Sequence, residues 1–167
     1  MPVEFTGVGN QGISFTGFQI PNISSAITIT AWVNLHSLSA TTNEIICQSF
    51  GEYYFALYFN QSGKVFFYAG TFPGAASWGT SVVQMSTGTP KMVAVTYDAG
   101  NVSNDPIIYV NGASVTITEI VAPSTTVSED VHMFIGTSDA ISHSIDGYLY
   151  TTNLYNRILS ATEILYA

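Results

Sequence analysis

The loop YDAGNVSNDP, residues 97–106, gathers side-chain oxygens that could bind a ligand. Asp98, Asn101, Asn104 and Asp105 fall within eight residues of one another. Calcium binds carboxylate and amide oxygens, so Asp98, Asn101 and Asp105 are candidate calcium ligands, and all four residues are candidate partners for sugar hydroxyls. Asp, Asn, Ser and Gly are also the residues from which ordinary turns are built. The turn interpretation is the favoured one of the two.

A second candidate ligand site is the stretch YAGTFPGAASWGT, residues 68–80, in which Phe72 and Trp78 flank small residues. An exposed tryptophan beside hydroxyls and amides is a platform for the apolar face of a pyranose ring. Aromatic rings also dominate the energetics of cores and interfaces, so both rings can instead close the end of the fold. Both interpretations stay open, with packing slightly ahead.

Residue spacing argues against catalysis. Glycoside hydrolysis needs two carboxylates that face each other across the scissile bond. None of the eleven acids has a same-face spacing within an expected strand, and the neighbours Glu129 and Asp130 point to opposite sides. No serine lies in a GxSxG turn, and His36, His132 and His143 are more often satisfied surface or core histidines than bases. Asp130 shares a strand face with His132, and Asp146 follows His143 by three residues, but a transition-metal site needs at least three converging ligands, so it is the weaker interpretation. We therefore predict a protein that is not an enzyme.

Charge narrows the range of partners. The net charge is −8, and the three cations are Lys64, Lys91 and Arg157. Phosphate backbones and anionic membranes require clustered cations, so we expect no nucleic acid partner and no membrane insertion. Only 8% of residues are charged, so hydroxyl and amide groups supply most of the polar surface. The desolvation free energy of such a surface on contact with a protein or a sugar is smaller than that of a charged surface. Cys47 stands alone in an apolar setting and is expected to be a buried thiol.

The elements that must position these residues are β-strands. In AITITAWVNLH, residues 26–36, apolar residues alternate with Thr28, Thr30, Trp32 and Asn34, which predicts a half-buried strand. The turn NQSG predicts a hairpin, and Asn111-Gly112 predicts a second one with a type I′ turn. Further strands are expected in VEFT, GISFT, NEIICQSF, TSVVQM, KMVAVTYD, HMFIG and GYLYTTNLY. This pattern predicts one all-β domain over residues 1–167, an antiparallel β-sandwich.

The chain closes with a short helical turn. Ser160 and Glu163 have the spacing of a capping box, in which the serine side chain and the glutamate side chain satisfy each other's backbone N–H groups. Ile164 and Leu165 are expected to tuck under the sandwich, and Arg157 is placed to reach a carbonyl or carboxylate on the sheet edge. We predict that Arg157, Ser160 and Glu163 form a structural clasp.

Several segments together resemble the laminin-G-like, concanavalin A-like jelly-roll family over nearly the whole chain. They are ITITAWVNL, GKVFFYA, MVAVTYDAG, IIYVNGASV, MFIGTS and GYLYTTNLYNRILSATEI. The chain departs from the family pattern where Tyr150 and Thr151 replace an Asp-Glu pair and where FTG, residues 5–7, replaces FDG. The resemblance implies a jelly-roll fold, which related glycoside hydrolases share. The departures remove acidic positions that relatives use for calcium or for fixing strand ends, so a metal site inherited from the family is in doubt.

Two functions of different classes follow. The first is a structural surface protein that docks on a protein lattice or on copies of itself as a homo-oligomer, for example a decoration protein on the exterior of a virus particle. The second is a lectin-like module that recognises glycans, for which calcium is a possible cofactor. The sequence begins without a secretion signal and contains no apolar run long enough to span a bilayer. We expect structural assembly slightly more than glycan recognition. The expected location is the exterior of a virus particle, and the alternative is the extracellular space, as part of a larger protein.

Overall fold

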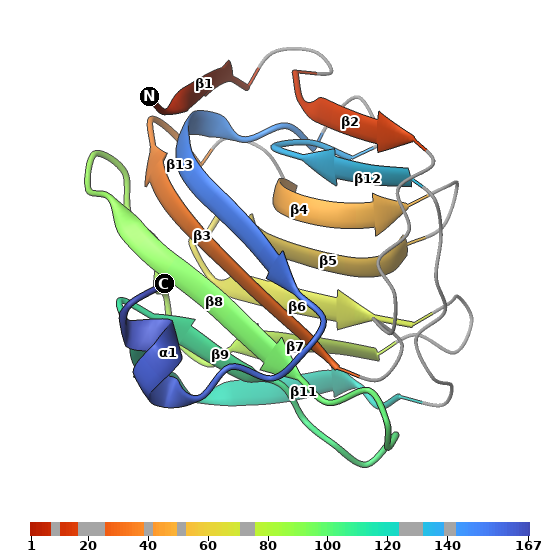
Figure 1. Cartoon of the computed structure of the whole chain (residues 1–167). Coiled ribbons are helices and arrows are strands. Elements are labelled where there is room, and N and C mark those ends of the chain that lie inside the picture. The colour runs from red at the N-terminus through yellow and green to blue at the C-terminus, as the bar shows by residue number, and fades with distance from the viewer. Residues whose placement is uncertain are drawn as a thin grey trace.

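The computed structural model describes residues 1–7, 11–16, 26–38, 42–49, 53–70, 76–123, 132–138 and 143–167, which form two antiparallel sheets packed face to face (Figure 1). Sheet A contains, in spatial order, β1 (Val3–Thr6), β13 (Asp146–Tyr155), β3 (Ile27–Leu35), β8 (Lys91–Tyr97), β9 (Ile107–Val110) and β10 (Ala113–Ser114). Sheet B contains β11 (Ile117–Val121), β7 (Ala76–Thr80), β6 (Val65–Ala69), β5 (Tyr53–Asn60), β4 (Thr42–Ser49), β12 (His132–Ile135) and β2 (Ile13–Thr16). The predicted all-β antiparallel sandwich is confirmed.

The core lies between the sheets and is built by the predicted alternation. In β3, Ile29, Val33 and Leu35 are fully buried and point inward. Thr28 and Thr30 point to the other face, yet they are also buried. The outer face of sheet A is therefore partly covered. The Thr28 hydroxyl donates to the carbonyl of Arg157 and accepts from the N–H of Leu159, which shows that the C-terminal segment covers it.

Both predicted hairpins are confirmed. The first connects β5 to β6 around Gly63, which has a φ of 77°. In the second, Asn111 and Gly112 have φ values of 51° and 81°, as a type I′ turn requires. A side chain at Gly112 would also collide with Leu165, because an added Cβ would lie 2.6 Å from its Cδ1 atom.

The strand predicted over TSVVQM is wrong. Strand β7 lies earlier, over Ala76–Thr80, and the residues that follow are not in a ladder. The backbone N–H groups of Gln84 and Met85 both donate to the carbonyl of Gly63, and the consecutive Val82 and Val83 are both exposed. This segment folds over the turn between β5 and β6, so its β-branched residues do not alternate between a core and a solvent face.

The chain ends in helix α1 (Ala161–Leu165), which lies against the outer face of sheet A (Figure 1). The predicted capping box between Ser160 and Glu163 is confirmed in both directions. Ile164 is buried with Leu159, Met92, Ala94 and Tyr109, whereas Leu165 is exposed. No helix in the described ranges is long and apolar enough to cross a bilayer.

The predicted contact of the Arg157 side chain with the sheet edge is wrong. Its guanidinium donates to Glu163 Oε1 at 2.7 Å, because the capping box already holds that carboxylate nearby. The Arg157 and Ser160 hydrogen bonds lower the pKa of Glu163 from 4.5 to about 2. The link to the sheet is made instead by the backbone of Arg157, whose carbonyl accepts from the Thr28 hydroxyl.

Candidate functional site

The loop after β8 uses its polar atoms to hold its own shape. Asp98 Oδ1 accepts from the backbone N–H of Gly100 at 3.0 Å, and Asn101 Oδ1 accepts from that of Ser103 at 2.8 Å. The side-chain amide of Asn104 donates to the carbonyl of Asp98 at 3.0 Å. These are the local contacts by which Asp and Asn stabilise turns, as the favoured interpretation of this loop expected.

Trp78 and Asp105, predicted as separate ligand contacts, are hydrogen-bonded to each other. The indole Nε1 donates to Asp105 Oδ1 at 2.8 Å. The Trp78 side chain is 0% exposed and packs beside the rings of Phe67 and Tyr97. An exposed sugar platform at Trp78 is therefore wrong, because the ring belongs to the core. Phe72 lies outside the described residues.

Asp98 and Asp105, two of the predicted calcium ligands, both act electrostatically on the hydroxyl of Tyr97. Burial raises the pKa of the Tyr97 hydroxyl, and the carboxylates of Asp105 and Asp98 raise it further. Within the described ranges, no group of three or more His, Cys, Asp and Glu residues could hold a metal ion. Calcium binding by Asp98, Asn101 and Asp105 stays a prediction.

A largely buried polar cluster joins sheet B to the segments that follow β12 and precede β13. Glu44 is buried on β4, and its Oε1 lies 3.9 Å from Nδ1 of His143, which is 3.0 Å from the hydroxyl of Ser138. Burial first, then Glu44 and Tyr68, raise the pKa of Tyr58 to about 12. The cluster joins a carboxylate to an imidazole and a phenol, whereas glycoside hydrolysis calls for two carboxylates across the bond.

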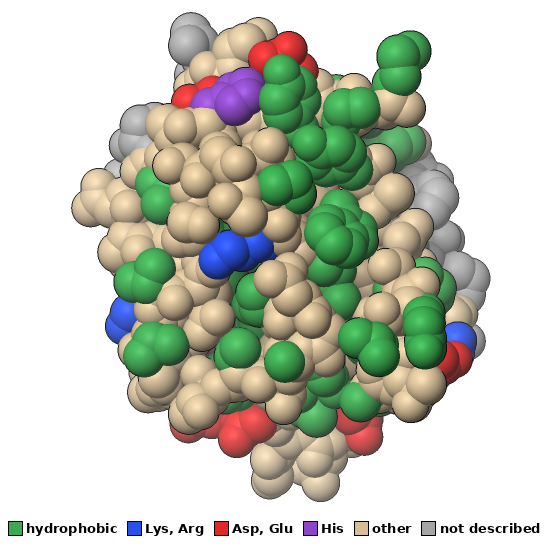
Figure 2. Space-filling model, turned by 90° about the vertical axis from the view of Figure 1, so that its left-hand side faces the viewer, with side chains coloured by type: hydrophobic (Ala, Val, Ile, Leu, Met, Phe, Trp, Pro, Cys, Tyr) green, Lys and Arg blue, Asp and Glu red, His purple; other side chains and the backbone are tan. Residues whose placement is uncertain are grey.

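The outer face of sheet A carries three rings, which we call the aromatic platform: the exposed Trp32 on β3 and Tyr150 on β13, and the half-buried Tyr148 on β13. Trp32 is 39% exposed and Tyr150 is 42% exposed, and together with Pro90 they line an open hollow. The rings of Tyr148 and Tyr150 lie 6.4 Å apart between centroids. Figure 2 shows hydrophobic side chains gathered in a band across one side of the molecule, among mostly uncharged surface.

A β-bulge places Tyr150 in this platform. Leu149 pairs with Val33 and Thr151 pairs with Trp32, so Tyr150 is the extra residue on β13. Bulges bend a strand and redirect a side chain. The redirected Tyr150 ring shares the hollow with Trp32.

Polar groups lie beside the rings. His36 packs edge-on against Tyr148 at 4.8 Å, and its Nδ1 lies 3.4 Å from Asp146 Oδ1. A hydrogen bond with Glu4 raises the pKa of the Tyr148 hydroxyl. The Trp32 indole N–H donates to the carbonyl of Ala167 at 3.4 Å, so the C-terminus borders the platform.

Reasoning from the sequence did not find this surface. A signal for Trp32 was present, because a large aromatic residue stands on the polar face of an alternating strand. No comparable signal marks Tyr150, since its position depends on the bulge. Neither residue belongs to the predicted sites in residues 68–80 and 97–106.

Solved structures of the same fold include a carbohydrate-binding module, a pentraxin and the binding domain of a toxin. A search of curated proteins found no match to the chain. A carbohydrate-binding module, CBM40 of the Ruminococcus gnavus IT-sialidase, has a TM-score of 0.72 at 13% identity, with 99% of this chain and 95% of that chain covered. A heptameric SAP-like pentraxin from Limulus polyphemus has a TM-score of 0.67 at 14% identity, with coverage of 98% and 79%. The binding domain of botulinum neurotoxin serotype D has a TM-score of 0.70 at 15% identity, with coverage of 99% and 40%.

These identities are low, so the structural matches establish a shared fold. The sequence itself supplies the family, because a laminin-G family model matches residues 7–165. The match covers every strand except β1 and the whole of helix α1, and it agrees with the sandwich topology described above. The chain belongs to this laminin-G-like family of the concanavalin A-like lectin/glucanases superfamily.

Proposed function

We propose that this domain is a non-catalytic carbohydrate-binding module whose ligand stacks on the aromatic platform. The observation that carries the proposal is the joint exposure of Trp32 and Tyr150 at one hollow, on a sheet face with few charges. Sugar rings have an apolar face that packs on aromatic side chains, and the neighbouring Glu4 and His36 supply partners for hydroxyls. Support also comes from the CBM40 module of similar fold, whose structures include complexes with α2,3- and α2,6-sialyllactose.

The test is a glycan array with the whole chain, in calcium and again in chelator, followed by titration of one bound glycan. We expect Trp32→Ala to weaken binding roughly tenfold, about 1.4 kcal/mol, because one stacking ring is lost. Phe15→Ala on β2 is the matched control, since Phe15 is also 39% exposed but lies in the other sheet. If Trp32→Ala and Phe15→Ala bind the glycan with equal affinity, the aromatic platform is not part of the binding site.

The calcium prediction is tested in the same experiment. If Asp98, Asn101 and Asp105 hold calcium that supports the ligand, then binding is lost in chelator and restored by added calcium. If the glycan binds equally well in calcium and in chelator, the side chains of Asp98, Asn101 and Asp105 only stabilise the turn and do not support the ligand through calcium.

A role in structural assembly is the second candidate function. Both edge strands of sheet B expose apolar side chains, namely Ile120 and Val121 on β11, and Ile13 and Phe15 on β2. Exposed sheet edges are natural contact sites for other chains. A lattice partner, self-association as a homo-oligomer, and a place on the exterior of a virus particle fit this observation. Sedimentation of the chain alone, and its co-sedimentation with intact particles, would test them.

A further inference from the structure

Strand β13 is covered by β1 along its first part and forms the edge of sheet A along its second part. Strand β1 pairs with β13 only from Asp146 to Leu149, whereas β13 continues to Tyr155. From Thr151 to Tyr155 it pairs with β3 on one side, and no described strand pairs with its other side. Pro2 lies just before β1 and has no N–H to donate to the ladder.

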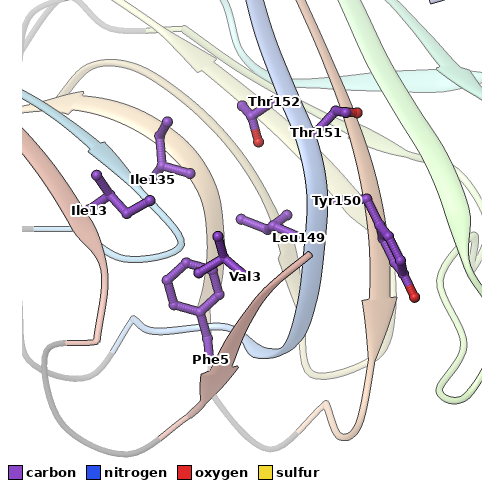
Figure 3. Close-up of a pocket in the computed structure, with 8 residues that line it drawn as sticks. All are labelled: Val3, Phe5, Ile13, Ile135, Leu149, Tyr150, Thr151 and Thr152. Carbon is purple, nitrogen blue, oxygen red and sulfur yellow. The ribbon is translucent and has the colours of Figure 1, made fainter. Parts of the chain in front are cut away.

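An apolar pocket opens between the two sheets beside this edge (Figure 3). Its volume is about 130 Å³. Side chains from sheet A and sheet B point toward one another around it: Val3, Phe5, Leu149 and Thr152 from sheet A, and Ile13 and Ile135 from sheet B. None of the described residues that line it has a charged side chain. Val3 and Ile13 are exposed, so the pocket is open to solvent.

We propose that an extended segment of a partner protein adds to sheet A along Thr151–Tyr155 and inserts an apolar side chain into this edge pocket. Unpaired N–H and C=O groups of an edge strand bind the backbone of another extended chain, and pockets beside the edge select its side chains. A cavity of roughly 150 Å³ holds a benzene molecule, so a pocket of this size accepts an aliphatic side chain. The uncharged lining selects an apolar residue over an ionic one.

Charge indicates what kind of partner this is. A second copy of the chain would bring a further net charge of −8 to this edge, so it is less favoured here than a neutral or basic partner. Glu4 on β1 adds a carboxylate beside the same edge. The occupant is therefore a neutral or basic segment of a different protein. Tyr150 also lines the pocket, but its ring points away from the other lining side chains toward the opposite face of β13 (Figure 3). This inference therefore does not depend on carbohydrate binding by that ring.

The first part of the test uses a displayed library of random seven-residue peptides, selected on the whole chain. We expect selected peptides to share one apolar position and to be neutral or basic. Ile13→Asp puts a charge at the mouth of the pocket and should weaken binding at least tenfold. Phe15→Asp is the control, because Phe15 lies on the same strand with an exposure of 39% against 38% for Ile13, but does not line the pocket.

The second part needs no variant, and so it remains valid if Ile13→Asp does not fold. Hydrogen exchange of the unmodified chain with a bound peptide should slow at alternate amides between Thr151 and Tyr155, because only outward N–H groups gain partners. A library that selects nothing, or binding without slowed exchange at this edge, would overturn the proposal. Dimerisation of the chain with the same exchange pattern, abolished by Ile13→Asp, would put a second copy there and would also overturn it.

Discussion

Thr28 offers a direct test of how the C-terminal segment is held on sheet A. Its hydroxyl donates to the carbonyl of Arg157 at 2.7 Å and accepts from the backbone N–H of Leu159 at 3.0 Å. The side chain is fully buried. Replacing it by valine keeps the shape and the β-branch, but leaves both backbone groups without this partner.

The expected loss can be worked out from these two contacts. A buried N–H without a partner costs about 1–3 kcal/mol, and a lost bond to the partly solvated carbonyl of Arg157 costs roughly 1 kcal/mol. We therefore expect Thr28→Val to lower the free energy of unfolding by about 2–4 kcal/mol. Thr28→Ser keeps the hydroxyl and loses one methyl group, so we expect a loss of about 1 kcal/mol.

Urea unfolding of the wild type and both variants measures these free energies, and an unchanged slope shows that the unfolding reaction is the same. Hydrogen exchange in α1 should also become faster in Thr28→Val, since the segment before the helix loses its attachment. If Thr28→Val is as stable as Thr28→Ser, the hydroxyl does not hold the clasp and the reasoning fails.

Three further predictions concern ionisable groups. Because the pKa of Glu163 is lowered from 4.5 to about 2 in the folded state, its contribution to stability is present above pH 4.5 and is lost as the pH falls toward 2. Glu163→Gln should remove that part of the acid dependence of the free energy of unfolding, measured in urea. An unchanged acid dependence would contradict the assignment. Because the pKa of Tyr58 is raised from 10.0 to about 12, stability should fall as the pH rises above 10, and Tyr58→Phe should reduce this fall, which thermal unfolding across that range would measure. Asp105→Ala should cost about 1–3 kcal/mol, because the buried Trp78 N–H loses its acceptor; a loss seen only with calcium present would assign Asp105 to metal binding instead.

The sequence by itself determined those features that depend on a few neighbouring residues. Alternation in residues 26–36 determined the central strand, the Asn111-Gly112 pair determined a turn with two positive φ angles, and Ser160 with Glu163 determined the helix start. Each of these follows from backbone sterics or from hydrogen bonds between residues close in the chain, so the local sequence is sufficient.

Only the tertiary structure decided which aromatic rings reach solvent. Trp78 stands in a run of small residues that left exposure and packing almost equally open, and it is buried because Phe67, Tyr97 and Asp105 surround it from other segments of the chain. Trp32 and Tyr150 lie far apart in sequence and meet because the pairing of β3 with β13 contains a bulge. Burial and strand register depend on residues distant in the chain, whereas a local pattern contains information only about its own neighbours.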